Sequence, residues 1–301
     1  MSTSHLDIHL KSKADFYIQG IYSNFKSQNY GEALACYKMA KCILQNFDQD
    51  DKVVWSKILY DMGNYFKSVS NVDSAIYCLD KAIEIYPEWD EAHYARSSII
   101  KSPLDHNTQI NVDRLYANTR IVDEYLCPER ISFYSDFFDA CIKLGINFNG
   151  RNIADVGCGP GLLLQIIAEK SNPNSLTGFD FSTEAIKVAN KKCPFGNFHQ
   201  FDIYSTHNES FDLVLCTETL EHLLYPEKAM QNLISMISPM GQLILCVPNG
   251  RLDTFEGHIN FWSPESWSTF IERTSENMPY TLTLLNGRHN VAIIKHNGAR
   301  K

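Results

Sequence analysis

The sequence has no long hydrophobic run, no excess of basic residues and no closely paired cysteines, and each absence removes a class of protein. No apolar stretch approaches the roughly 20 residues that a membrane-spanning helix needs. Lys and Arg number 27 against 35 Asp and Glu, so the net charge of −8 gives no overall attraction to nucleic acid. The nine cysteines contain no C-x-x-C pair and do not have the spacing of a small disulfide scaffold.

The amino-terminal stretch MSTSHLDIHLKSK also lacks the apolar segment of a secretory signal. Several cysteines lie inside apolar runs, such as Cys216 in LVLC and Cys246 in LILC, as small core residues of a reducing compartment do. We therefore expect a cytoplasmic protein without a membrane span.

The first third of the chain has helical periodicity. Residues 56–87 carry small and apolar residues at the spacing of a paired-helix repeat, at Leu59, Met62, Gly63, Phe66, Ala75, Leu79, Ala82 and Pro87. A glycine stands where two helices would touch, alanines lie at the crossing and a proline ends the second helix. The pattern resembles the tetratricopeptide repeat, and a generic helical hairpin is the alternative. We expect tetratricopeptide-like helical repeats over residues 1–102.

An earlier copy of this repeat is less regular. The stretch YGEALACYKMA supplies Ala33, Tyr37 and Ala40 in the corresponding places, but Ala33 and Ala75 are farther apart than the family's period of about 34 residues. An insertion around QNFDQDD would explain the difference, and DEAHYARSSII would form a capping helix. Because fewer than three repeats rarely stand alone, we expect this unit to lean on the domain that follows.

Residues 103–149 are expected to form a linker and lid helices. Pro, Asp and Asn in KSPLDHN break the helical pattern. Helical periodicity resumes over residues 127–145, where Pro128 suits a first turn and Gly145 an end.

Residues 150–301 alternate between strand and helix patterns. Apolar strands are expected at NIADVG, SLTGFD, NFHQFD, FDLVLC and QLILCVP, and helices at GLLLQIIAEK, STEAIKVANKK and YPEKAMQNLISMI. Such alternation predicts a parallel sheet with helices on both faces. The tail TLTLLNGRHNVAIIK adds two strand patterns around Asn-Gly, which indicates a hairpin. The expected fold is α/β and Rossmann-like, a mostly parallel sheet with a terminal antiparallel hairpin, preceded by an all-α helical-repeat domain.

Glycines and acids follow the ends of the first strands of this sheet. ADVGCGPG places Gly157, Gly159 and Gly161 at the start of a helix, where the backbone can approach a ligand closely. The G-x-G-x-G spacing argues against a dinucleotide fold, as does Asp155, which would crowd a pyrophosphate. An acidic strand end suits a ligand with a cationic head. Asp180 closes the second strand, where a carboxylate can accept from both hydroxyls of a ribose.

Asp202 follows the third strand and completes an ordered series. The series resembles the class I S-adenosylmethionine-dependent methyltransferases over residues from about 150 to 295. The resemblance implies S-adenosylmethionine as cofactor, with its methionine part beside Asp155 and Gly157, its ribose at Asp180 and its adenine at Asp202. The implied cofactor-binding residues are Asp155, Gly157, Cys158, Gly159, Gly161, Asp180, Phe181, Asp202, Ile203 and Thr217. Among them Ile203 also faces the adenine, Phe181 packs against its ring, and Thr217 lies beside the cofactor.

The later motif SFDLVLCTETLEHL … ISPMGQLILCVPNG resembles the subgroup of ubiquinone-pathway O-methyltransferases. Met240 departs from it, because that subgroup commonly has glycine there; we expect the turn to tolerate the change since Gly241 remains. No N-P-P-Y-like tetrad follows FDLVLC, which disfavours methylation of DNA adenine or glutamine amides.

The stretch TETLEH carries candidate catalytic residues. If a helix begins near Thr217, then Glu218, Glu221 and His222 share one face. The loop NGRLDTFEGHINFW after the fifth strand brings His258 to the same edge of the sheet. The four residues resemble the metal site of the small-RNA 3′-end 2′-O-methyltransferases, and similar residues occur in ubiquinone-pathway enzymes. The resemblance implies a divalent metal at Glu218, Glu221, His222 and His258.

A metal would make chemical sense for methylation of an alcohol, because it lowers the pKa of the hydroxyl and fixes its position. Magnesium is the first expectation, and two imidazoles would also suit manganese, iron or zinc. The alternatives are a helix dipole that favours Glu218, a capping box at Glu221, and a metal-free general base at His222. The catalytic candidates are Glu218, His222 and His258.

The leading hypothesis is therefore methylation of a hydroxyl on a small metabolite or sugar, with the repeats binding a protein or peptide or a second copy. One alternative is an RNA or protein methyltransferase recruited through the repeats, although the net acidity weighs against RNA. Another is a non-catalytic adaptor with a vestigial methyltransferase fold, against which the intact DVGCGPG, Asp180 and Asp202 argue.

Overall fold

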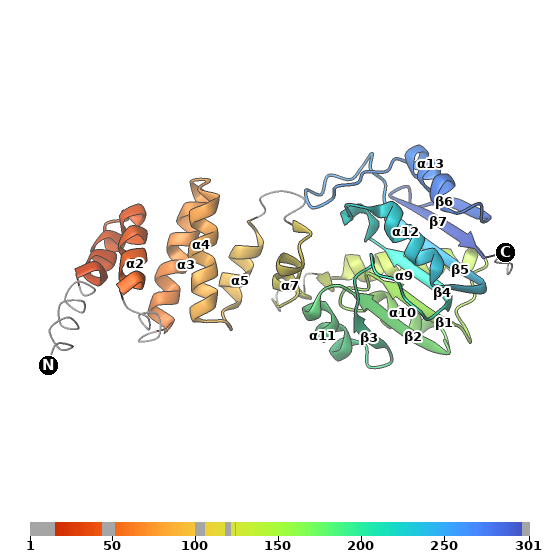
Figure 1. Cartoon of the computed structure of the whole chain (residues 1–301). Helices are drawn as coiled ribbons and strands as arrows, with labels where there is room; N and C mark the ends of the chain where they lie inside the picture. Colours follow the sequence, from red (N-terminus) through yellow and green to blue (C-terminus); the bar gives the residue numbers. More distant parts are fainter. Residues whose placement is uncertain (1–15, 44–51, 100–105, 118–121, 124, 297–301) are drawn as a thin grey trace. The chain divides into compact units, whose positions relative to one another are not determined.

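The computed structural model describes residues 16–43, 52–99, 106–117, 122–123 and 125–296 (Figure 1). The chain divides into two compact units, and the division falls between Ile99 and residue 100. The insertion expected around QNFDQDD overlaps residues 44–51, so it lies outside the described residues. Among the residues with described structure, no helix is both long and apolar enough to cross a membrane.

The amino-terminal unit is helical throughout its described ranges. Residues 16–26 are helical and are followed by α2 (Tyr30–Ile43), α3 (Lys52–Ser68), α4 (Val72–Ile85) and α5 (Asp90–Ser97). The crossing of α3 and α4 is close at Gly63, where an added Cβ would lie 2.6 Å from the Cγ of Leu79. Ala75 and Ala82 are buried on the facing side of α4. These helices match the expected hairpin, and their membership of the tetratricopeptide repeats stays a prediction.

The carboxy-terminal unit is a seven-stranded sheet with helices on both faces. Its helices are α7 (Gln109–Ala117), α9 (Pro128–Lys143), α10 (Leu162–Lys170), α11 (Thr183–Lys192), η2 (Leu220–His222), α12 (Pro226–Ser235) and α13 (Pro264–Thr274). Its strands are β1 (Asn152–Val156), β2 (Ser175–Asp180), β3 (Asn197–Gln200), β4 (Phe211–Thr217), β5 (Ile237–Pro248), β6 (Tyr280–Leu285) and β7 (His289–Lys295). The strand order is β3-β2-β1-β4-β5-β7-β6; β1 to β5 pair in parallel, and β7 is antiparallel to both of its neighbours. The predicted fold is confirmed.

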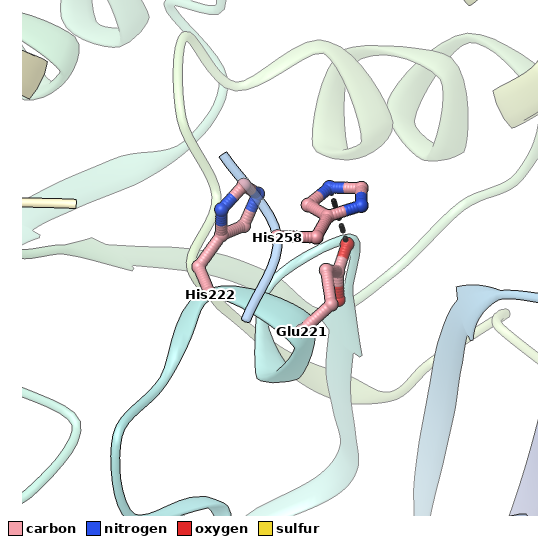
Figure 2. Close-up of side chains that lie close together, drawn as sticks. All are labelled: Glu221, His222 and His258. Carbon is pink, nitrogen blue, oxygen red and sulfur yellow. Dashed lines mark ion pairs between the residues drawn. The ribbon is translucent and has the colours of Figure 1, made fainter. Parts of the chain in front are cut away.

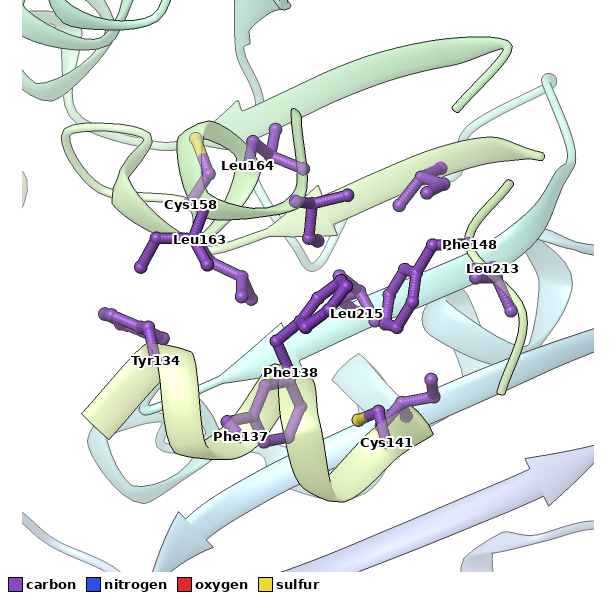
Figure 3. Packing of buried hydrophobic residues seen from close by; sticks show 14 of the residues in the cluster. Tyr134, Phe137, Phe138, Cys141, Phe148, Cys158, Leu163, Leu164, Leu213 and Leu215 are labelled. Atoms are coloured by element: carbon purple, nitrogen blue, oxygen red, sulfur yellow. The ribbon is translucent and has the colours of Figure 1, made fainter. Parts of the chain in front are cut away.

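The two faces of the sheet have separate cores because successive side chains of a strand point to opposite sides. On β4, Leu213 and Leu215 contribute to a core with α9, α10 and α11, whereas Val214 and Cys216 pack with α12 and α13. Figure 3 shows the first core, where aromatic residues of α9 lie over the strands. This double burial fits the near-continuous apolar runs in the sequence.

The predicted terminal hairpin is also confirmed. β6 and β7 pair directly, and the turn between them contains Asn286 with φ of 50° and Gly287 with φ of 71°. Arg288 N–H donates to the Leu285 carbonyl at 3.0 Å within the three-residue loop, 286–288, that joins the paired residues Leu285 and His289. Asn-Gly favours such a turn because both residues tolerate positive φ.

Met240 lies in a bulge of β5 that needs a left-handed residue. Phe211 of β4 pairs with Ile237 and Leu213 with Gln242, so residues 238–241 leave the regular register. Met240 has φ of 68° and its side chain is 74% exposed. The side chain therefore adds little packing to offset the backbone strain, which explains why glycine suits this position.

We expect Met240→Gly to raise the free energy of unfolding by about 1 kcal/mol, because a left-handed L residue costs roughly 1–2 kcal/mol and glycine's larger unfolded-state entropy returns part of that gain. Urea unfolding would measure the change. Met240→Ala is the matched control, since it keeps the Cβ and should gain nothing. Equal stability of the glycine and alanine variants would contradict the explanation.

Candidate active site

The glycine-rich loop after β1 has glycine at positions where a side chain would be strained or would clash. Gly157 and Gly161 have φ of 81° and 82°, a region that L residues rarely occupy. A Cβ on Gly157 would lie 2.1 Å from the Oγ1 of Thr219. The loop therefore packs directly against the turn that follows β4, and the two predicted halves of the site are neighbours.

Two buried carboxylates lie beside this loop. Asp180, 7% exposed, accepts from the Gly159 N–H through Oδ2 and from the Ser182 N–H through Oδ1, both at 2.9 Å. Asp155 is 1% exposed, and its Oδ1 has no hydrogen-bond partner among the described residues. Burial raises the pKa of Asp155 to about 8, and the charge of Asp180 adds to the rise. A cationic or hydroxyl-bearing ligand would satisfy these oxygens.

The other residues of the implied cofactor site differ in exposure. Phe181 is 36% exposed, so its ring is free to cover a planar ligand, and Asp202 is an exposed residue whose Oδ1 accepts from the Tyr204 N–H at 2.9 Å. Cys158 and Thr217 are buried, and Ile203 is half-buried. The structure thus lines these residues along the carboxyl ends of β1 to β4, where ligands of open α/β sheets bind.

Helix α7 lies against the same edge of the sheet. Its Asp113 accepts through Oδ1 from the Ser182 hydroxyl at 2.6 Å and from the Glu184 N–H at 3.3 Å, at the start of α11. The Tyr116 hydroxyl is close to the glycine loop, 3.1 Å from where a Cβ of Gly159 would be. Burial raises the pKa of Tyr116 well above its ordinary value, so this phenol stays neutral.

The TETLEH stretch does not form the α-helix that would put its acids on one face. β4 continues to Thr217, Glu218 adopts a left-handed φ of 53°, and only the short 3-10 turn η2 follows. The spacing argument for Glu218, Glu221 and His222 assumed regular α-helical geometry, so it does not apply here. Glu218 is outside the group of Glu221, His222 and His258 whose ligand atoms lie close together.

Glu221, His222 and His258 come together instead, and Figure 2 shows their side chains converging. One ligand atom of each lies within 4.8 Å of the others. The Glu221 Oε1 and the His258 Nε2 are 3.9 Å apart, which is too long for a hydrogen bond. Glu221 is 1% exposed, and neither of its carboxylate oxygens has a hydrogen-bond partner within the described part of the chain.

The charges of this cluster are poorly solvated. Burial raises the pKa of Glu221 well above its ordinary value, and the nearby charge of Glu218 raises it further. Burial lowers the pKa of His222 to about 3, and His258 adds to the fall, so the His222 imidazole is neutral near pH 7. A buried carboxylate without a donor beside a neutral imidazole is a suitable set of ligands for a divalent cation.

Glu218 has different neighbours. Its Oε2 is 3.9 Å from the Arg130 Nη1 on α9, and its Oε1 is 3.8 Å from the His289 Nε2 on β7. Burial raises the pKa of Glu218 to about 7, and Arg130 opposes the rise. The structure thus brings together three of the four predicted metal ligands and places Glu218 in a neighbouring group with a permanent cation.

Sequence reasoning missed the side chains that hold the two histidines. Asp253 Oδ2 lies 2.5 Å from the His258 Nδ1, and Asn107 Oδ1 lies 2.9 Å from the His222 Nδ1. Asp253 stands in the same loop as His258, so an acid five residues before a candidate histidine was an available signal. Asn107 is 115 residues from His222, and no local pattern points to it.

Comparisons with known proteins identify the family of the carboxy-terminal unit. A family described as "Methyltransferase domain" matches residues 124–276. A ubiquinone biosynthesis O-methyltransferase of Coxiella burnetii (strain Dugway 5J108-111) is 30% identical over 120 residues, 38% of this chain and 50% of that protein. Its counterpart in Paracidovorax citrulli (strain AAC00-1) is 31% identical over 114 residues, 35% of this chain and 47% of that protein. The chain spans about half the length of these curated relatives.

A solved structure described as a "DhpI-SAH complex structure" superposes with a TM-score of 0.50 at 15% identity, over 65% of this chain and 97% of that one. At this identity the likeness concerns the fold. The family match covers half of the chain, together with the glycine loop and the acids at the strand ends. The chain therefore belongs to the methyltransferase-domain family and carries a class I S-adenosylmethionine-dependent methyltransferase domain.

Proposed function

We propose that this protein transfers the methyl group of S-adenosylmethionine to a hydroxyl oxygen of a small acceptor, with a divalent metal held by Glu221, His222 and His258. The observation that carries the proposal is the pair of buried, unpartnered Glu221 oxygens facing two imidazoles beside the glycine loop. The curated relatives, which are O-methyltransferases, support oxygen as the acceptor atom.

The three residues fit a metal by their chemistry. One carboxylate and two imidazoles match the preferences of manganese, iron or zinc, and magnesium would fit with substrate oxygens completing its ligands. A bound ion would supply Lewis-acid chemistry, which makes a hydroxyl a better nucleophile near neutral pH. The protein's part is to hold these ligand atoms in a dry cluster before the acceptor arrives.

The cofactor residues take the roles that their positions allow. Asp180 accepts from the ribose hydroxyls, and Asp155 lies where a cationic methionine head would neutralise its charge. Gly157 and Thr219 pack against each other, so the cofactor loop and the metal cluster are adjacent. This adjacency would align the sulfur, the methyl carbon and the acceptor oxygen, which need an approach of about 3–3.5 Å.

Helix α7 serves as the lid in this proposal. Asp113 fastens it to the start of α11, and Tyr116 covers the glycine loop. A covered site excludes water, which protects the methyl donor from side reactions.

Calorimetric titration with S-adenosylhomocysteine, followed by turnover assays with acceptors that carry adjacent hydroxyls, tests the proposal. We expect one site per chain and turnover that a chelator abolishes and added Mg²⁺ or Mn²⁺ restores. If exhaustive chelation left turnover unchanged, a metal would have no role in the reaction, and His222 or His258 would be the candidate general base. A folded protein that does not bind S-adenosylhomocysteine would favour the non-catalytic adaptor.

For the amino-terminal unit we propose a tetratricopeptide-like repeat that docks a protein or peptide or a second copy of the chain. The close approach of Gly63 to Leu79 and the buried alanines of α4 support it, because such repeats need small residues where their helices cross.

A further inference from the structure

Each histidine of the cluster is held by a hydrogen bond at its Nδ1. The His222 Nδ1 is 2.9 Å from the Asn107 Oδ1 and 3.3 Å from the Gly257 carbonyl oxygen. The His258 Nδ1 is 2.5 Å from the Asp253 Oδ2. The ring nitrogen that bears the proton is set by the partner of the other nitrogen, so these contacts govern what Nε2 can do.

The amide of Asn107 has a defined orientation. Its Nδ2 donates to the Gly257 carbonyl at 2.9 Å, and a flipped amide would put two oxygens against each other. Oδ1 must therefore face His222, whose Nδ1 then has two acceptor oxygens around it and must carry the proton. His222 is left with a lone pair on Nε2.

Asp253 has the same effect on His258. Its side chain is largely buried, and an ionised carboxylate only accepts, so the His258 Nδ1 donates and its Nε2 keeps a lone pair. That Nε2 is the atom that faces the Glu221 Oε1 at 3.9 Å. No hydrogen bond joins the two atoms at this distance, and a divalent cation between them would satisfy both.

The loop that carries His258 is shaped for the Asn107 contact. A Cβ on Gly257 would lie 1.8 Å from the Cδ2 of His106, so glycine at this position leaves room for the His106 ring against the loop. Asn107 thereby joins three parts of the chain: the segment before α7, the turn η2 and the loop after β5.

We propose that Asn107 and Asp253 are positioning residues that hold His222 and His258 in the Nδ1–H tautomer, so that both Nε2 atoms are available to a metal ion beside Glu221. This inference rests on the proposed function. Residues that hydrogen-bond to metal-binding histidines do not contact the ion themselves. Their removal typically lowers metal affinity by roughly 10- to 100-fold.

The test is a titration of the full-length, metal-free protein with Co²⁺ followed by visible absorption, together with calorimetry of S-adenosylhomocysteine as a check of folding. We expect Asn107→Ala and Asp253→Ala each to weaken Co²⁺ binding by roughly 10- to 100-fold while S-adenosylhomocysteine affinity is retained. Asp253→Asn keeps an acceptor oxygen for Nδ1–H and should lose less. Asn190→Ala and Asp139→Ala remove exposed contacts far from the cluster in sequence and should bind Co²⁺ like the wild type.

The outcomes separate the two proposals. A folded wild type that does not bind Co²⁺ would overturn the metal in the proposed function, whereas wild-type affinity in both alanine variants would overturn the positioning roles alone. Imidazole nitrogen-15 shifts of the metal-free wild type provide a measurement that needs no variant. Protonated Nδ1 on both rings is the expected result, and protonated Nε2 on either ring would refute the role of its partner.

Discussion

Glu221→Gln is expected to lower turnover by at least about 100-fold while S-adenosylhomocysteine affinity stays close to that of the wild type. The substitution keeps the shape of the side chain but removes the negative charge that the two imidazoles need to hold a divalent cation. Loss of a positioned catalytic group typically costs roughly 10²- to 10⁴-fold. Steady-state kinetics and calorimetry on the same preparation would measure both quantities.

The stability of the metal-free protein should not fall with the activity. Burial raises the folded-state pKa of Glu221 above its unfolded value, so the stability from its protonated form is fully present below the unfolded pKa and is lost as pH rises through the folded pKa. Glutamine has no charge to bury, so the variant should be at least as stable as the wild type at pH 7. Parallel loss of activity and stability would instead indicate a structural role.

A matched control for Glu221→Gln is Glu227→Gln, which removes only an exposed ion pair with Arg273. Exposed pairs contribute about 0–1 kcal/mol, so the control should retain both turnover and stability. Undiminished turnover in Glu221→Gln would exclude Glu221 from the mechanism, whatever the control does.

Asp180→Ala is expected to weaken cofactor binding by roughly 100-fold. Two ribose hydroxyls would each lose a hydrogen bond to a charged acceptor, at about 1.5 kcal/mol apiece, and the Gly159 N–H would lose the oxygen that holds the glycine loop. Calorimetry with S-adenosylhomocysteine would measure the loss, with Asp139→Ala as the control for a surface acid. Unchanged affinity would refute the assignment of the ribose to Asp180.

The pH dependence of binding gives an independent check on Asp180. Burial raises the pKa of Asp180 to about 6, and the hydrogen bonds from the Ser182 and Gly159 N–H groups partly oppose this rise. The protonated form is favoured in the free protein below that value, whereas both the loop and the ribose need the ionised form. We therefore expect the contribution of Asp180 to affinity, taken as the difference between the wild type and Asp180→Asn, to fall by about tenfold for each pH unit below 6 and to be nearly flat above 7. A flat profile between pH 5 and 7 would contradict the role.

The residue order along the chain was sufficient for the fold and for the edge of the sheet at which the candidate residues gather. Alternating strand and helix periodicities, the Asn286–Gly287 turn and the glycines after β1 each depend on a few consecutive residues, and all appear in the structure where they were expected. Asp155 and Asp180 come at the carboxyl ends of two parallel strands. Because parallel strands have their carboxyl ends at the same edge of a sheet, the sequence predicted that a ligand would bind at that edge.

The grouping of Glu221, His222 and His258 and the residues that support them came only from the folded chain. Glu218 has a left-handed φ, and its carboxylate lies near Arg130 and His289, outside the group of Glu221, His222 and His258. Asn107 reaches His222 across 115 residues, and its amide orientation depends on a carbonyl of a third segment. The periodicity of a helix or strand depends on residues that are close together in the sequence. The direction of a buried side chain depends instead on packing and hydrogen bonds with segments that meet only after folding.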